Sequence, residues 1–89
     1  MARIKNNVLA MLDAAAENKI RLSYYSHKEG KRYEFDIESQ TDFYLFQMCD
    51  PWGNVVSQAL ILKDGIKNYF KSADALFEYA IYMQACITK

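Results

Sequence analysis

The stretch IRLSYYSHKEGKRYEFDIE, residues 20–38, carries the clearest structural signal in the chain. Apolar and polar side chains alternate on both sides of a polar, glycine-containing centre, which is typical of two half-buried strands joined by a turn. Pairing the positions whose numbers sum to 57 places Leu22 opposite Phe35 and Tyr24 opposite Tyr33 on one face. We therefore predict an antiparallel hairpin with that face buried.

The charged residues favour the same register. It brings Arg21 beside Asp36 and Lys19 beside Glu38 on the second face. Opposite charges in such cross-strand pairs stabilise a sheet. Across the whole chain, eleven basic and eleven acidic residues cancel, which excludes binding to nucleic acid by bulk positive charge.

A helix is expected before this hairpin and a second hairpin after it. Residues 3–18 predict the helix, because Ile4, Val8, Leu12 and Ala15 recur at helical spacing. Two apolar runs, residues 43–49 and 54–62, predict the second hairpin. The residues between them, Asp50-Pro51-Trp52-Gly53, suit a type I turn. Residues 55–62 can also be read as a helix, since short apolar runs are ambiguous.

The end of the chain predicts a short strand and another helix. Lys63-Asp64-Gly65 is a turn signal, and residues 66–70 are expected to form a fifth strand. Ser72 is a good N-cap residue for a helix that reaches about residue 87. The predicted fold is therefore α+β, as a single domain over residues 1–89. It has an N-terminal helix, a four- to five-stranded antiparallel sheet made of two hairpins, and a C-terminal helix.

The second hairpin and the last helix hold more apolar residues than one buried face needs. Residues 43–62 are mostly apolar on both sides, so one sheet face stays exposed if both helices cover the other. The alternative is a small closed barrel in which no apolar surface remains exposed. We take the face of Tyr44 as the solvent side. The candidate protein contacts are then Tyr44, Phe46, Met48, Trp52, Val56, Leu60 and Tyr82.

The composition points to a soluble, non-secreted protein of the cytoplasm. No apolar run approaches the roughly 18 residues of a membrane span, and the first residues do not resemble a signal peptide. Two cysteines, Cys49 and Cys86, are too few for a disulfide framework, which fits a reducing compartment. We expect no membrane partner and no cofactor.

Residues that could carry catalysis are scarce. His27 is the single histidine and falls in a predicted turn. Cys49 is the only obvious thiol nucleophile, and nothing in the sequence brings it to His27. His27, Cys49 and Cys86 also lack metal-ligand spacing. We therefore expect the protein not to be an enzyme and to hold no metal.

Contact with nucleic acid is a second hypothesis. Arg21, Tyr25, Lys28, Lys31 and Arg32 surround the first hairpin. Basic groups interleaved with aromatic rings suit single strands, because bases stack on rings while cations follow phosphates. The alternative is that Tyr25 only packs on Arg32, its cross-strand neighbour.

The chain resembles WYL domains in a few short motifs. These are Ile20 to Ser26, Gly30-Lys31, and Phe43-Tyr44-Leu45 followed by Cys49-Asp50 and Gly53-Asn54. The resemblance implies a helix followed by a small, strongly bent, Sm-like sheet, in a non-enzymatic regulatory module of bacteria or their mobile elements. Tyr24 and Tyr44 stand at matching positions. The family's arginine-rich last strand corresponds here to Val55 to Leu62, which contains no arginine.

The surplus of apolar surface favours a protein-interaction or regulatory binding module that self-associates or docks on a protein partner. One alternative is a regulatory domain of the WYL or Sm-like type that binds nucleic acid or a ligand. Another is a small inhibitor of a host protein, encoded by a phage or plasmid.

Overall fold

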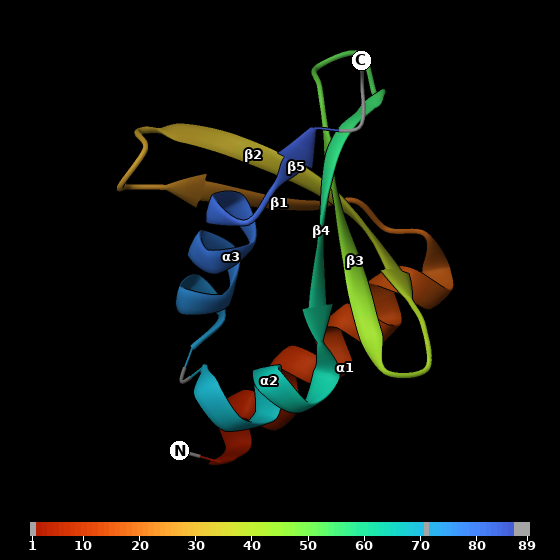
Figure 1. Cartoon of the computed structure of the whole chain (residues 1–89), viewed down its shortest axis with the longest axis vertical. Coiled ribbons are helices and arrows are strands. Elements are labelled where there is room, and N and C mark those ends of the chain that lie inside the picture. The colour runs from red at the N-terminus through yellow and green to blue at the C-terminus, as the bar shows by residue number, and fades with distance from the viewer. Residues whose placement is uncertain (1, 71, 87–89) are drawn as a thin grey trace.

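A computed structural model describes residues 2–70 and 72–86, with side chains for residues 8–66, 69–70 and 72–85 (Figure 1). The elements are α1 (Ala2–Asn18), β1 (Leu22–Ser26), β2 (Lys31–Ser39), β3 (Phe43–Cys49), β4 (Val55–Leu62), α2 (Lys63–Tyr69), α3 (Ala73–Tyr82) and β5 (Ala85–Cys86). The five strands form one antiparallel sheet in the order β1-β2-β3-β4-β5. The predicted α+β class is confirmed.

The first hairpin has the predicted register. Leu22 lies opposite Phe35, and Tyr24 lies opposite Tyr33. On the other face, Arg21 donates from Nε and Nη2 to the two carboxylate oxygens of Asp36, over 2.9 and 3.1 Å. This fork-shaped pair confirms that the apolar and charge patterns point to one arrangement.

The expected contact between Lys19 and Glu38 is not the one that forms. Glu38 accepts a hydrogen bond from Gln40 instead. Lys19 has a φ of 56°, in the left-handed region, and helix α1 ends just before it. The backbone N–H of Ile20 then donates to the Ala15 carbonyl, which closes the helix end. Lys19 therefore serves as the helix terminus and not as a strand residue.

The second hairpin is formed as expected and β4 faces as predicted, but β3 faces the other way. Gly53 N donates to the Asp50 carbonyl over 2.9 Å, so the predicted turn is present, and residues 55–62 are a strand. Met48 pairs with Ser57 and Cys49 with Val55, which leaves Val56 as the extra residue of a β-bulge. This pairing groups the even-numbered residues of β3 with the odd-numbered residues of β4 on the buried face.

The prediction for the C-terminal part is partly wrong. The expected fifth strand at residues 66–70 is helix α2, which follows β4 directly and buries Ile66. Ser72 caps α3 as predicted, because its side chain accepts from Ala75 N over 3.2 Å. That helix ends at Tyr82, and the fifth strand is the two-residue β5. Ile87 lies outside the described residues, as does the side chain of Ile4.

One core joins all three helices to one face of the sheet. Its centre is aromatic: the ring centroids of Phe35, Phe46 and Phe77 lie 5.7 to 6.0 Å apart, and Tyr24 stacks on Phe77 at 5.1 Å. The buried apolar residues are Val8, Leu12, Ala15, Phe35, Ile37, Tyr44, Phe46, Ala59, Ile61, Ile66, Leu76, Phe77 and Ala80. The predicted stripe on α1 is therefore confirmed at Val8, Leu12 and Ala15.

The long strand β2 pairs with β1 on one side and β3 on the other, so it connects the β1–β2 hairpin to the β3–β4 hairpin. Figure 1 shows these hairpins running in clearly different directions. The β1–β2 hairpin projects beyond the body formed by the helices and the β3–β4 hairpin. The sheet's second face, opposite the helices, is called the outer face below. Among the described helices, none has the length and apolar character that crossing a membrane requires.

Candidate interaction surfaces

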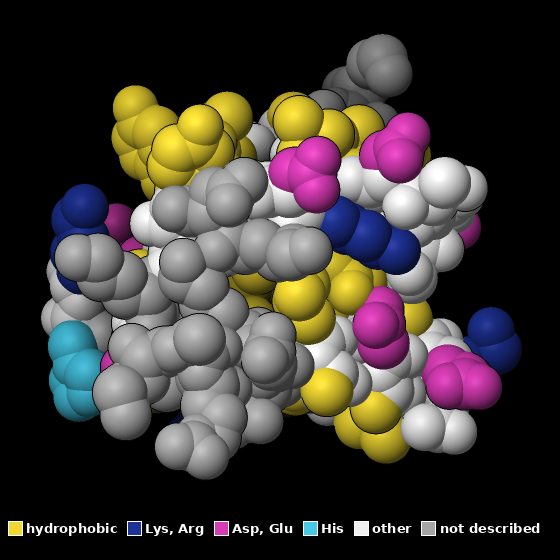
Figure 2. All heavy atoms as spheres, turned by 90° about the horizontal axis from the view of Figure 1, so that it is seen from below, with side chains coloured by type: hydrophobic (Ala, Val, Ile, Leu, Met, Phe, Trp, Pro, Cys, Tyr) yellow, Lys and Arg dark blue, Asp and Glu magenta, His cyan; other side chains and the backbone are white. Residues whose placement is uncertain are grey.

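Four large apolar side chains lie on the outer face of β3 and β4. The register sets Phe43 opposite Leu62 and Leu45 opposite Leu60. Leu60 and Leu62 are 54% and 56% exposed, and Phe43 and Leu45 are half-buried. We call these four residues the outer leucine face. Figure 2 shows hydrophobic side chains reaching the surface along one border of the molecule.

The residues around the outer leucine face are polar, with amides on β3 and β4 and charged groups on the β2 side. The next pair toward the turn is Gln47 with Gln58, and on β2 the residue beside Leu45 is Glu38. Further along, Asp36 lies opposite Gln47 and is paired with Arg21. Along β3 and β4, the outer face therefore carries apolar and amide groups without a charge.

The structure corrects the predicted contact residues. Tyr44 and Phe46 are 1% and 0% exposed and belong to the core, so their assignment to the solvent side is wrong. Met48 is half-buried and packs against the core, and Val56 is the half-buried bulge residue. Leu60 is on the exposed face as expected. The β-bulge at Val56 explains the difference for Tyr44 and Phe46. It shifts the pairing by one residue, so that these two side chains share a face with the buried Ile61 and Ala59.

Two predicted aromatic anchors are exposed but lie apart from the outer leucine face. Trp52 is 82% exposed at the tip of the β3–β4 turn, where its backbone N–H donates to Asp50 Oδ1. Tyr82 is 80% exposed on α3, on a stripe that it shares with Tyr79 and Met83. The sequence reasoning did not name Leu62, Tyr69 or Tyr79 as contacts. Strand alternation already places Leu62 on the same face as Leu60.

The candidate nucleic-acid contacts are divided between the two faces of the first hairpin and its turn. Tyr25 and Arg32 lie opposite each other on the outer face, and Arg32 also donates to Ser23 Oγ. Lys31 instead lies over the Tyr33 ring, with its Nζ 5.3 Å from the ring centroid. Arg21 is held by Asp36.

The turn that joins β1 and β2 carries basic groups that lie close to an acidic one. Lys28 and His27 lie close enough to Glu78 to help lower the pKa of that carboxyl, after the larger effect of its hydrogen bonds. Figure 2 shows the single histidine at one end of the molecule, beside a basic side chain. Acidic and basic groups therefore alternate here, and they do not build a continuous positive patch.

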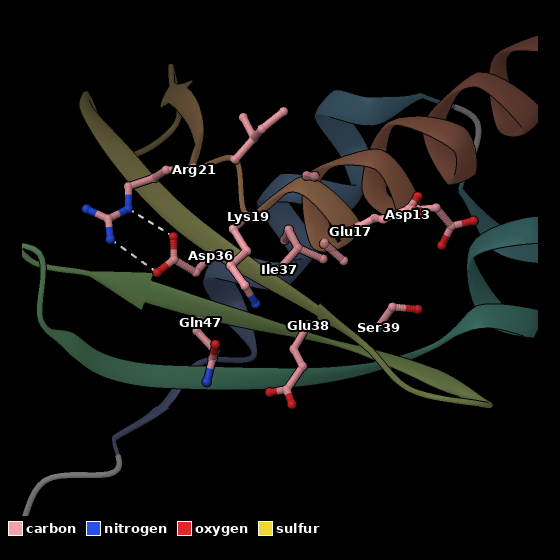
Figure 3. A pocket seen from close by; sticks show the side chains of 12 residues that line it. Asp13, Glu17, Lys19, Arg21, Asp36, Ile37, Glu38, Ser39 and Gln47 are labelled. Atoms are coloured by element: carbon pink, nitrogen blue, oxygen red, sulfur yellow. Dashed lines mark hydrogen bonds and ion pairs between the residues drawn. The ribbon is translucent and has the colours of Figure 1, made fainter.

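An open groove of about 820 Å³ runs between the end of α1 and the outer side of β2. Figure 3 shows Arg21 and Asp36 pointing toward each other at one end of it, and Asp13 and Glu17 of α1 at the other. The hydrogen bond from Arg21 holds the pKa of Asp36 below its usual range. Burial raises the pKa of the neighbouring Cys49 thiol, so Cys49 has the character of an unreactive, half-buried thiol.

A hydrogen-bonded cluster ties β1 to α3 on the inner side. Tyr24 Oη and Ser26 Oγ both donate to Glu78 Oε2, over 2.7 and 2.8 Å. Burial, and then this hydrogen bond, raise the pKa of Tyr24 to about 12. The two donors lower the pKa of Glu78. We assign the cluster a structural role, because the Glu78 carboxylate already accepts hydrogen bonds from two residues of β1.

No described group of three or more His, Cys, Asp or Glu side chains could hold a metal ion. His27 lies in the exposed β1–β2 turn with its ring edge-on to Tyr25, at 5.0 Å between centroids. Cys49 ends β3 and pairs with Glu34 and Val55. Comparison of the chain with protein-family models, curated proteins and solved structures gives no match.

Proposed function

We propose that this protein is a non-catalytic interaction module that binds a second copy of itself through the outer leucine face. The observation that carries this proposal is the pair of exposed leucines, Leu60 and Leu62, on the sheet face opposite the helices. Exposed apolar side chains grouped in this way mark contact sites on proteins of this size. Burying them against another chain removes apolar surface from water, which favours association.

A second copy is the occupant that suits this chemistry. A charged face repels its own copy, but the outer face of β3 and β4 carries leucines and the amides of Gln47 and Gln58. Leucines pack on leucines, and an amide both donates to and accepts from another amide. The net charge of the chain is zero, so two copies approach without overall repulsion. Two such faces can stack as sheets at a separation of about 10 Å.

The predicted dimer is weak. Specific, stable interfaces bury a total of about 1,200–2,000 Å². The outer leucine face supplies only the apolar centre of such a contact, since two of its four residues are half-buried. We therefore expect dissociation in the micromolar to millimolar range, with a polar rim around the leucines that includes Glu38 on the β2 side.

Sedimentation velocity over a wide concentration range tests the proposal. The wild-type chain should show a reversible monomer–dimer equilibrium, and Leu60→Glu with Leu62→Glu should remain monomeric. Tyr69→Glu is the matched control, because it adds a charge at an exposed apolar residue of α2. Thermal melts should show that all variants are folded.

Two results contradict the proposal. One is a wild-type chain that stays monomeric up to near-millimolar concentration. The other is a dimer that survives both leucine substitutions and is abolished by Tyr82→Glu, since that result would place the contact on α3.

A further inference from the structure

Strand β1 is an edge of the sheet that no other strand covers within the described part of the chain. Among the described strands, only β2 pairs with its backbone. Helix α3 reaches β1 from the inner side through side chains, by the Tyr24–Phe77 stack and the Glu78 hydrogen bonds. An edge strand offers backbone N–H and C=O groups to any extended segment that can lie beside it.

Apart from its short length of five residues, this edge lacks the features that usually protect one. Proteins commonly keep an exposed edge short or place charges, proline or a bulge on it. The sequence of β1 is Leu-Ser-Tyr-Tyr-Ser, without a charge or a proline, and its pairing with β2 is regular. Ser26 is buried, so the available part is residues 22–25, where Ser23 and Tyr25 are exposed.

We propose that residues 22–25 of β1 bind an extended segment of another protein by strand addition, which lengthens the sheet by one strand. In this mode, main-chain hydrogen bonds supply the affinity and alternate side chains supply the specificity. The side chains beside Leu22 and Tyr24 continue the inner, apolar face of the sheet. Those beside Ser23 and Tyr25 continue the outer, exposed face. The segment therefore has alternating apolar and polar residues.

The choice of another protein over a second copy rests on the proposed function. If the outer leucine faces already form a two-fold dimer, a second self-contact through β1 would build open-ended chains. A foreign segment avoids this and leaves each dimer with two independent edges. The outer-face dimer and strand addition occupy different strands, so the failure of one is visible separately from the failure of the other.

The test uses a synthetic peptide of alternating threonine and valine as the probe. Backbone N-methylation at every second residue blocks the hydrogen bonds along one edge of an extended peptide and leaves the other edge intact. Two peptides are prepared, one methylated at odd positions and one at even positions. The outer-face variant Leu60→Glu with Leu62→Glu is included, so that binding is measured without dimerisation.

We expect saturable binding of the unmodified peptide, seen by fluorescence anisotropy, and slower amide hydrogen exchange within residues 22–25. One methylated peptide should bind at least tenfold more weakly than the other. A scrambled peptide with its valines in one block should bind more weakly than the alternating one.

Three outcomes overturn the inference. The first is an absence of binding by the alternating peptide, and the second is binding that leaves the exchange of residues 22–25 unchanged or is equally affected by both methylation patterns. The third is protection of these amides that rises with protein concentration alone, which would make a second copy the occupant.

Discussion

Tyr24 Oη donates a hydrogen bond to Glu78 Oε2 over 2.7 Å, across 54 residues of sequence. Ser26 Oγ donates to the same oxygen over 2.8 Å. Together these bonds fasten the projecting β1–β2 hairpin to α3, beside the stack of Tyr24 on Phe77. The carboxylate of Glu78 therefore accepts hydrogen bonds from two residues of edge strand β1 and helps to hold it in position.

The charge on Glu78 should make stability depend on acid pH. Its two hydrogen bonds lower its pKa in the folded chain relative to the ordinary value of 4.5. A lowered native pKa contributes stability that is present above the unfolded pKa and is lost as the pH falls through the native one. Glu78→Gln should thus unfold at lower urea concentration than wild type at neutral pH, and the difference should shrink below about pH 4.

Urea midpoints measured between neutral and acid pH check this expectation. Tyr24→Phe removes one of the two donors and should give an intermediate dependence on pH. Asp36, whose pKa Arg21 also lowers, keeps part of the acid sensitivity in both variants. Equal pH dependence in wild type and Glu78→Gln would show that the charge of Glu78 does not stabilise the fold.

The first hairpin was predictable because two independent patterns agreed on its register. Leu22 with Phe35 and Arg21 with Asp36 satisfy the apolar and the charge rule at once. The second hairpin offered only one pattern, since both sides of β3 and β4 are apolar. Without a charge to mark the solvent side, the facing depends on the bulge at Val56.

The same ambiguity explains the other differences. Residues 66–70 are too short a stretch for the apolar pattern to distinguish a strand from a helix. The structure has helix α2 here, with Ile66 buried in the core. The outer leucine face was expected as a surplus of apolar surface, but its residues could not be named without the register. Leu60 was placed correctly, and Tyr44 and Phe46 were not.

One face of the second hairpin is buried and the other is exposed. Replacing an apolar residue should therefore lower stability strongly on the first face and little on the second. Phe46 is fully buried among Phe35 and Phe77, and its replacement by alanine should cost about 3–5 kcal/mol of unfolding free energy. Leu60 is half-exposed, and Leu60→Ala should change stability by no more than about 0.5 kcal/mol in the monomer. Chemical denaturation at low protein concentration measures both.

If Phe46→Ala does not fold, Phe46→Leu provides a milder change at the same position. A larger loss from Leu60→Ala than from Phe46→Leu would mean that the two faces of β3 and β4 are assigned the wrong way round.

Two glycines should respond oppositely to replacement by alanine. Gly53 closes the β3–β4 turn with a φ of 88°, a conformation that costs a side-chain-bearing residue about 1–2 kcal/mol. The nearest atom to an added Cβ is Arg21 Nη1 at 3.6 Å, so the expected loss comes from the backbone and not from a clash.

Gly65 lies inside helix α2, where an added Cβ would meet only Tyr69 Cδ2, at 3.9 Å. Gly65→Ala should therefore stabilise the chain by about 0.5–1 kcal/mol, because alanine loses less conformational freedom in a helix. Thermal melts of the two variants beside wild type measure both shifts. A stabilised Gly53→Ala would contradict the turn geometry, and a destabilised Gly65→Ala would favour the strand originally expected at residues 66–70 over helix α2.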